Sequence, residues 1–165
     1  MEKSLKKRMS LWMKLLIGAA AMVVVLNIIS FLIEESKPIP ALIQIKEVSG
    51  RTESDVAKIL GKGKFEEKWK NERAGCTVCP KYSYQDGKYE VIFINDVADR
   101  ITVNNLDNYD YKDKIIMGLL GLSDTTPTTQ TNLVKRWNSY EGFREIMAFN
   151  KNGKVDYVVV LSKAE

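Results

Sequence analysis

The 165-residue sequence contains no histidine, and this absence excludes several kinds of chemistry. Ser-His-Asp and Cys-His nucleophilic sites both need an imidazole. Histidine is also among the commonest zinc ligands, and the two cysteines of the chain are too few to complete a zinc site. A glycine-rich phosphate loop is missing as well, since Gly61-Lys62-Gly63-Lys64 indicates a helix end followed by a basic segment. We therefore expect no catalytic residues, no metal and no cofactor.

An excess of positive charge is also missing from most of the chain, although the net charge is +4. Residues 1–33 carry five basic residues and one acidic residue, which accounts for the whole excess of +4. Residues 34–165 carry 20 basic and 20 acidic residues. A protein that binds along the phosphate backbone of a nucleic acid needs a stripe of basic residues on its surface. The sequence therefore argues against nucleic acid as a partner.

Charge is entirely absent from Leu15 to Ile33, a run of 19 mostly apolar residues. A helix of this length spans about 28 Å at about 1.5 Å per residue, close to the roughly 30 Å of a bilayer's hydrocarbon core. Residues 11–13 extend the run by nearly one turn, and Trp12 suits the membrane interface. The sequence predicts a transmembrane helix over residues 11–33, and it identifies as anchor residues Leu15, Ile17, Val24, Leu26 and Ile33.

The charges on either side of this helix predict its orientation. Residues 1–10 form a basic tail, whereas Glu34 and Glu35 follow the apolar run. Because basic flanks stay in the cytoplasm, we expect a single-pass plasma-membrane protein with its C-terminal domain outside. The short anchor and the compact design favour a bacterial host. A cleaved secretory signal also begins with basic residues, but its apolar core is about 7–15 residues long and ends at a small-residue cleavage site. Neither feature is found here, so we expect the anchor to remain uncleaved.

The residues after the anchor divide into a short stalk and one domain. Pro38 and Pro40 favour an extended stalk over residues 34–48. Its segment 41–45, Ala-Leu-Ile-Gln-Ile, is apolar enough to dock on the domain. The 117 residues from 49 to 165 suffice for one compact domain with its own core.

This domain contains two similar halves, at about 49–105 and 106–165. In the first half, Thr52 is a suitable N-cap for a helix that ends before Gly61. Asp86-Gly87 then indicates a hairpin before the strand at 89–94, and a turn over 95–99 leads to another strand.

In the second half, a helix over 111–120 ends before Gly121. Asn152-Gly153 then joins strands at 143–149 and 155–161. We expect Trp69 and Trp137 to occupy equivalent core positions in the two halves. The pattern predicts an α+β fold of two helix-plus-hairpin repeats, with one antiparallel sheet and helices on one of its faces.

The first half also resembles a known family. The segment from Ser49 through Gly61 resembles the opening of the small lipoprotein of the outer-membrane β-barrel assembly machine, with matching residues Gly50, Thr52, Val56, Leu60 and Gly61. The tandem unit is similar to β-lactamase inhibitor protein. Two departures are the missing lipid-anchor cysteine and the presence of Lys62-Gly63-Lys64 where the family has a proline. The resemblance implies a helix-on-sheet binding module, without indicating its partner or its functional residues.

Cys76-Thr77-Val78-Cys79 is the sharpest motif in the chain. Outside the membrane, the compartment favours a structural disulfide between Cys76 and Cys79. A redox-active dithiol is an alternative, but it needs a lowered thiol pKa, and Pro80 with a strand follows instead of a helix. A metal site would need further ligands from a partner chain, and two free thiols are the remaining alternative.

Tyrosines near strand ends and loops suggest a binding surface, because tyrosine is favoured at protein interfaces. The candidate residues, together with one from the threonine-rich loop at 125–131, are Tyr82, Tyr84, Tyr109, Tyr111, Tyr140 and Thr128. We interpret Asp96 and Asp99 as turn residues rather than as a catalytic pair.

Taken together, these features predict a non-catalytic, membrane-anchored module that binds another protein or a cell-envelope component. An inhibitory role or a role in envelope assembly are narrower versions of the same prediction. The alternative function is that of a thiol-disulfide oxidoreductase using Cys76 and Cys79.

Overall fold

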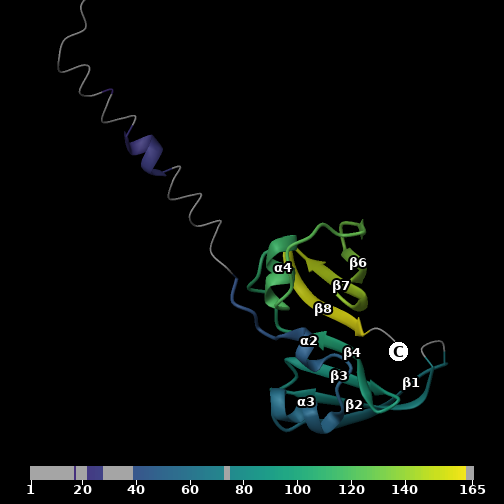
Figure 1. Ribbon diagram of the computed structural model, residues 1–165. Coiled ribbons are helices and arrows are strands. Elements are labelled where there is room, and N and C mark those ends of the chain that lie inside the picture. Colours follow the sequence, from purple (N-terminus) through teal and green to yellow (C-terminus); the bar gives the residue numbers. More distant parts are fainter. Residues whose placement is uncertain (1–16, 18–21, 28–38, 73–74, 163–165) are drawn as a thin grey trace, which may run out of the picture. The chain divides into compact units, whose positions relative to one another are not determined.

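The computed structural model describes residues 17, 22–27, 39–72 and 75–162, and it divides the chain into two units, 1–38 and 39–165 (Figure 1). In the first unit, Ile17 and the segment 22–27 are helical and exposed. No helix among the described residues is long and apolar enough to cross a membrane. Leu15, Ile33 and most of the predicted span lie outside the described residues, so the anchor stays a prediction.

The second unit is an α+β fold built on one antiparallel sheet of eight strands. The strands are β1 (Lys64–Asn71), β2 (Cys76–Tyr84), β3 (Tyr89–Ile94), β4 (Val97–Val103), β5 (Thr129–Gln130), β6 (Val134–Tyr140), β7 (Phe143–Lys151) and β8 (Lys154–Ser162). Their order across the sheet is β1-β2-β3-β4-β8-β7-β6-β5. This arrangement confirms the predicted fold class and the antiparallel sheet.

The strand order shows two four-stranded meanders that meet in the middle of the sheet. Strands β1 to β4 form the first meander and β5 to β8 the second (Figure 1). Their last strands pair with each other, with Arg100 opposite Leu161 and Val103 opposite Val158. Each meander follows a helix in the sequence, so the two halves share one order of elements.

Three short helices accompany the sheet: α2 (Ile45–Val48), α3 (Glu53–Leu60) and α4 (Asp113–Leu119). Helix α3 begins where predicted, because the Thr52 hydroxyl oxygen accepts a hydrogen bond from the Asp55 N–H at 3.4 Å. It ends at Gly61, whose φ of +92° suits glycine. Helix α4 starts two residues later than predicted, since Lys112 is still extended.

The helices cover one face of the sheet, and the main core lies between the helices and this face. Alternate strand residues point to this face, as the period of two requires. The core joins helical residues such as Val56 and Ile116 to strand residues from both meanders. The buried strand residues of the core include Tyr89, Val91, Ile101, Val103, Trp137, Ile146, Val158 and Val160.

The apolar part of the predicted stalk belongs to this core. Ile43, Ile45 and Val48 are buried. The backbone N–H of Leu42 donates to the Leu119 carbonyl at 2.9 Å, and the Tyr89 hydroxyl donates to the Leu42 carbonyl at 2.8 Å. The compact unit therefore begins at Ile39, ten residues before the expected boundary at 49. Segment 39–48 docks on the domain without joining the sheet.

Several local predictions need correction. Two strands are absent from the predicted elements, namely β1 at residues 64–71 and β6 at residues 134–140. The expected turn at 95–99 is only two residues long, because Asn95 and Asp96 both adopt positive φ, so that β4 begins at Val97.

Trp69 and Trp137 are not equivalent. Trp137 is 1% exposed and its indole N–H donates to the Thr125 carbonyl at 3.1 Å, within the main core. Trp69 lies instead in a separate cluster and is only partly buried. The two residues occupy β1 and β6, which are not corresponding strands of the meanders.

Tyr84 and Tyr89 offer a matched test of what a buried hydroxyl hydrogen bond contributes to stability. Both side chains are 1% exposed, but only Tyr89 has a hydroxyl partner among the described residues. Burial raises the pKa of Tyr84 to about 12. We expect Tyr89→Phe to lower the free energy of unfolding by roughly 1–2 kcal/mol, because the Leu42 carbonyl loses its donor. Tyr84→Phe removes an unpartnered hydroxyl, so stability should stay equal or rise. Urea unfolding of the full-length protein in detergent measures both, and an equal loss in both variants would contradict this account.

An ion pair joins segment 39–48 to the second meander. Lys46 Nζ lies 2.6 Å from Glu141 Oε2, and the backbone N–H of Ser123 donates to Glu141 Oε1 at 3.0 Å. These contacts, led by the one with Lys46, lower the pKa of Glu141 from 4.5 to about 2. The ionised pair therefore stabilises the fold above about pH 4.5, and this contribution is lost as the pH falls toward 2.

We expect Glu141→Gln to lower the free energy of unfolding by about 1 kcal/mol at pH 7. The difference from the wild-type protein should shrink steadily between pH 4.5 and 2. Chemical unfolding at several pH values measures it. The control is Glu72→Gln, which removes an ion pair whose side chains are 67% and 75% exposed and should change little. A pH-independent loss in Glu141→Gln would contradict the assigned role.

Candidate functional site

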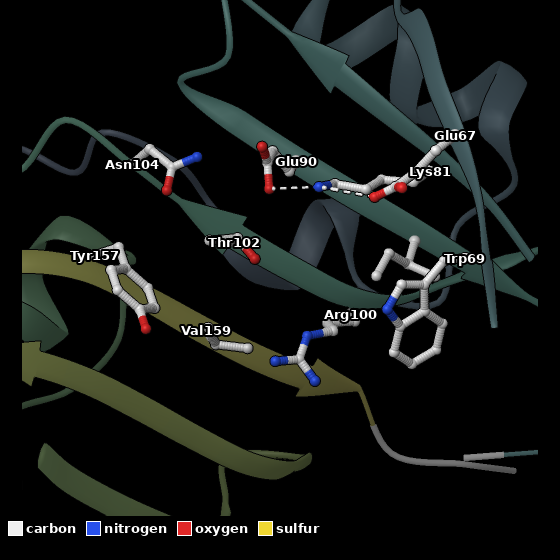
Figure 2. A pocket seen from close by; sticks show the side chains of 10 residues that line it. Glu67, Trp69, Lys81, Glu90, Arg100, Thr102, Asn104, Tyr157 and Val159 are labelled. Atoms are coloured by element: carbon white, nitrogen blue, oxygen red, sulfur yellow. Dashed lines mark ion pairs between the residues drawn. The ribbon is translucent and has the colours of Figure 1, made fainter. Parts of the chain in front are cut away.

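The face of the sheet opposite the helices carries a hollow of about 410 Å³ (Figure 2). Its lining comes from both meanders, with contributions from β1, β2, β3, β4 and β8. The residues that line it are Glu67, Trp69, Lys81, Glu90, Ile92, Arg100, Thr102, Asn104, Tyr157 and Val159. We call this surface the open face.

The alternation of each strand places these side chains on the open face. On β3, Val91 points to the core while Glu90 and Ile92 point to the hollow. On β4, Ile101 points to the core while Arg100 and Thr102 line the hollow. Strand register then brings separate strands together, since Thr102 lies opposite both Glu90 and Val159. The hollow is thus a property of the sheet rather than of a loop.

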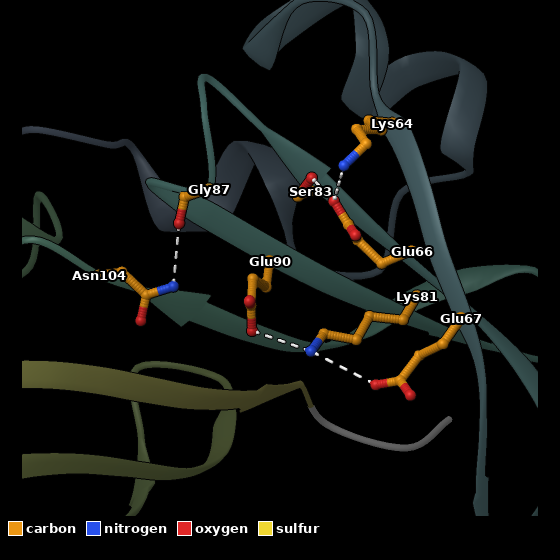
Figure 3. A network of polar contacts seen from close by, with 8 residues as sticks. All are labelled: Lys64, Glu66, Glu67, Lys81, Ser83, Gly87, Glu90 and Asn104. Atoms are coloured by element: carbon orange, nitrogen blue, oxygen red, sulfur yellow. Dashed lines mark hydrogen bonds and ion pairs between the residues drawn. The ribbon is translucent and has the colours of Figure 1, made fainter.

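An ion-pair network holds the acidic residues of the hollow. Lys81 Nζ lies 3.2 Å from Glu90 Oε2 and 3.6 Å from Glu67 Oε1 (Figure 3). One ammonium group therefore engages both carboxylates. This suits a structural contact between β1, β2 and β3, and it leaves no free pair of acids for general acid-base catalysis.

Three further hydrogen bonds flank the network. Glu66 on β1 accepts hydrogen bonds from Ser83 and Lys64, and the Ser83 contact lowers the pKa of Glu66. Asn104 donates to the Gly87 carbonyl at 3.0 Å (Figure 3). These bonds hold the rim of the hollow in place.

Arg100 differs from the other charged residues of the hollow. It is partly buried, and its side chain forms no ion pair or hydrogen bond with any residue that the structure describes. Figure 2 shows the side chain reaching into the hollow between Val159 and Trp69. An arginine in this position offers several donors to a molecule that enters the hollow.

A disulfide lies at one end of the open face. Cys76 and Cys79 are bonded and are 1% and 6% exposed. They pack with Ile92, Ile94 and Trp69 in a small cluster separate from the main core. Because Ile92 and Trp69 also line the hollow, the disulfide supports its floor. In redox enzymes, a helix N-terminus lowers the thiol pKa of the reactive cysteine. Here both cysteines lie on strand β2 instead.

The tyrosines predicted as a binding surface lie on the helix-covered side. Tyr84 is buried, and the other four are partly buried against the main core, namely Tyr82, Tyr109, Tyr111 and Tyr140. Tyr111 donates to the Ala148 carbonyl at 2.8 Å and Tyr140 to the Ser123 carbonyl at 2.9 Å. Thr128 is exposed, and its hydroxyl oxygen accepts the Asn138 N–H at 3.1 Å. These six residues do not form one exposed surface.

Sequence reasoning missed the residues of the open face. The usable signal was on β3 and β4, where Glu90 and Thr102 each stand between two buried apolar residues. That pattern identifies an uncovered face, but only the strand order shows that residues from β1 and β8 share it.

No protein-family model, no curated protein and no solved structure matches the chain. The resemblance noted from residues 49–61 therefore remains an expectation.

Removing the disulfide should weaken the fold without changing it. In the double variant Cys76→Ser/Cys79→Ser, we expect the circular dichroism spectrum to persist, because the main core contains neither cysteine. The entropy of closing so short a loop predicts a loss of roughly 2 kcal/mol in the free energy of unfolding. Adding dithiothreitol to the wild-type protein should give a similar loss and should leave the double variant unaffected. Loss of the sheet signal would contradict a purely local role.

Proposed function

We propose that the protein is a non-catalytic, membrane-anchored module that binds another protein through the open face of its extracytoplasmic sheet. The observation that carries this proposal is the hollow on the sheet face opposite the described helices α2, α3 and α4, lined by tryptophan, tyrosine and arginine. These are the residue types most enriched among the energetically dominant residues of protein interfaces.

The rigidity of the surface also supports recognition. Every lining residue except Asn104 lies on a strand, and Asn104 is held by Gly87. A surface that is already ordered loses little conformational entropy when a partner binds. Catalysis receives less support, because the two acids of the hollow share Lys81.

The anchor and the tandem design complete the proposal. Residues 11–33 would insert in the bilayer, with residues 1–10 in the cytoplasm and the domain outside, because the flanking charges have that bias. The two halves, each a helix followed by a four-stranded meander, are in keeping with a duplicated unit like the one suggested by the resemblance to helix-on-sheet binding proteins. An inhibitory or envelope-assembly role is a narrower form of this proposal.

Site-specific photocrosslinking in intact cells tests the binding function. A photoreactive amino acid at Thr102, inside the hollow, should attach one dominant protein. The matched control is the same amino acid at Asp107, which is exposed and lies outside the hollow. Equal attachment from both positions, or mixed disulfides with many proteins through Cys76 or Cys79, would overturn the proposal.

Filling the hollow should block this interaction without unfolding the protein. In Thr102→Arg, a long side chain is added at a partly exposed position on the open face, so stability should change by no more than about 0.5 kcal/mol. With the photoreactive group moved to the adjacent lining position Tyr157, we expect attachment of the dominant protein to fall at least about ten-fold. Unchanged attachment would show that the partner contacts another surface.

A further inference from the structure

Arg100 stands apart from the other arginines that the structure describes. Arg136 pairs with Glu145 and Arg144 with Asp99, while the Arg51 side chain donates to the Glu47 carbonyl at 3.3 Å. Only Arg100, among these four, has a side chain without a hydrogen-bonding or ionic partner within the described residues. It is also the one that lines the hollow.

We propose that Arg100 binds the carboxylate of a glutamate or aspartate side chain from the protein partner, which rests on the proposed function of the open face. Guanidinium and carboxylate groups match in a planar, bidentate geometry. When a partner covers the hollow, Arg100 loses water, and a charge left without an acceptor is strongly unfavourable. A partner with a carboxylate at this position should therefore bind more tightly than a partner without one.

The other residues of the hollow restrict the partner segment that enters it to one with a single acidic residue. Lys81 is already engaged by Glu67 and Glu90, so Arg100 is the cation left for a ligand. The two glutamates would repel a second acid on that side of the hollow. Trp69 and Tyr157 are partly exposed and offer aromatic surface in the same hollow. The expected partner segment therefore has one acidic residue between apolar residues, rather than an acidic run.

Nuclear magnetic resonance of the full-length, ¹⁵N-labelled protein in detergent micelles tests this recognition. The probes are the peptide acetyl-Phe-Glu-Phe-amide and its neutral match, acetyl-Phe-Gln-Phe-amide. We expect the glutamate peptide to bind at least about ten-fold tighter, as one charge-assisted pair allows. Binding should shift the Trp69 indole and Arg100 Nε–H signals, because both groups line the hollow.

Variants identify the arginine that is responsible. Arg100→Gln should abolish the preference for the glutamate peptide, and Arg100→Lys should keep part of it because the charge remains. The control Arg51→Gln removes an exposed arginine from outside the hollow and should keep the full preference. The amide spectrum reports whether each variant is folded. Comparing the two peptides on the wild-type protein tests the preference for glutamate without any variant.

The outcomes separate this inference from the proposed function. If both peptides shift the Trp69 signal equally, or if Arg100→Gln retains the preference, carboxylate recognition is overturned while binding at the open face stands. If neither peptide shifts Trp69 or Arg100, the inference is also overturned, and the crosslinking from Thr102 decides separately whether the face binds a protein.

Discussion

The pairing of β4 with β8 is the interaction on which the rest of the structure depends. It is the hydrogen-bonded ladder that joins the two meanders, and it runs from Arg100 opposite Leu161 to Val103 opposite Val158. On the covered side, it places Ile101 beside Val160 and makes the two hydrophobic halves one core. On the other side, it brings lining residues from both meanders into one hollow. A break here would divide both the core and the candidate site.

The docking of segment 39–48 has a consequence for the site. Ile39 packs against the main core, and an added Cβ on Gly118 would lie 2.8 Å from the Ile39 Cβ, so this contact needs glycine. The segment then follows the helix-covered side, where Tyr89 and Glu141 hold it. Residues 39–48 therefore pack on the helix-covered side of the sheet and do not line the hollow of the open face.

Local physics explains what could be predicted from the sequence and what could not. The capping oxygen of Thr52, the stop at Gly61 and the turn at Asn152-Gly153 act within a few residues, so they can be read without the fold. Strand β1 was missed because all its residues except two are exposed, which leaves no alternation to detect. The candidate site depends on which strands become neighbours and which face the helices cover. Both are tertiary facts, and they decide that Tyr84 is buried while the other four candidate tyrosines pack partly buried against the main core.

The edges of the sheet favour recognition through its face. At one edge, β1 carries lysines such as Lys68 and Lys70, and at the other, β5 is only two residues long. Charged and very short edge strands are how proteins avoid pairing with another strand. A partner that added a strand would meet these barriers, whereas the hollow presents ordered side chains and Arg100, whose side chain has no ionic partner in the part of the chain that the structure describes. Because both edges disfavour an added strand and the described helices cover one face, these features support the open face as the proposed recognition surface.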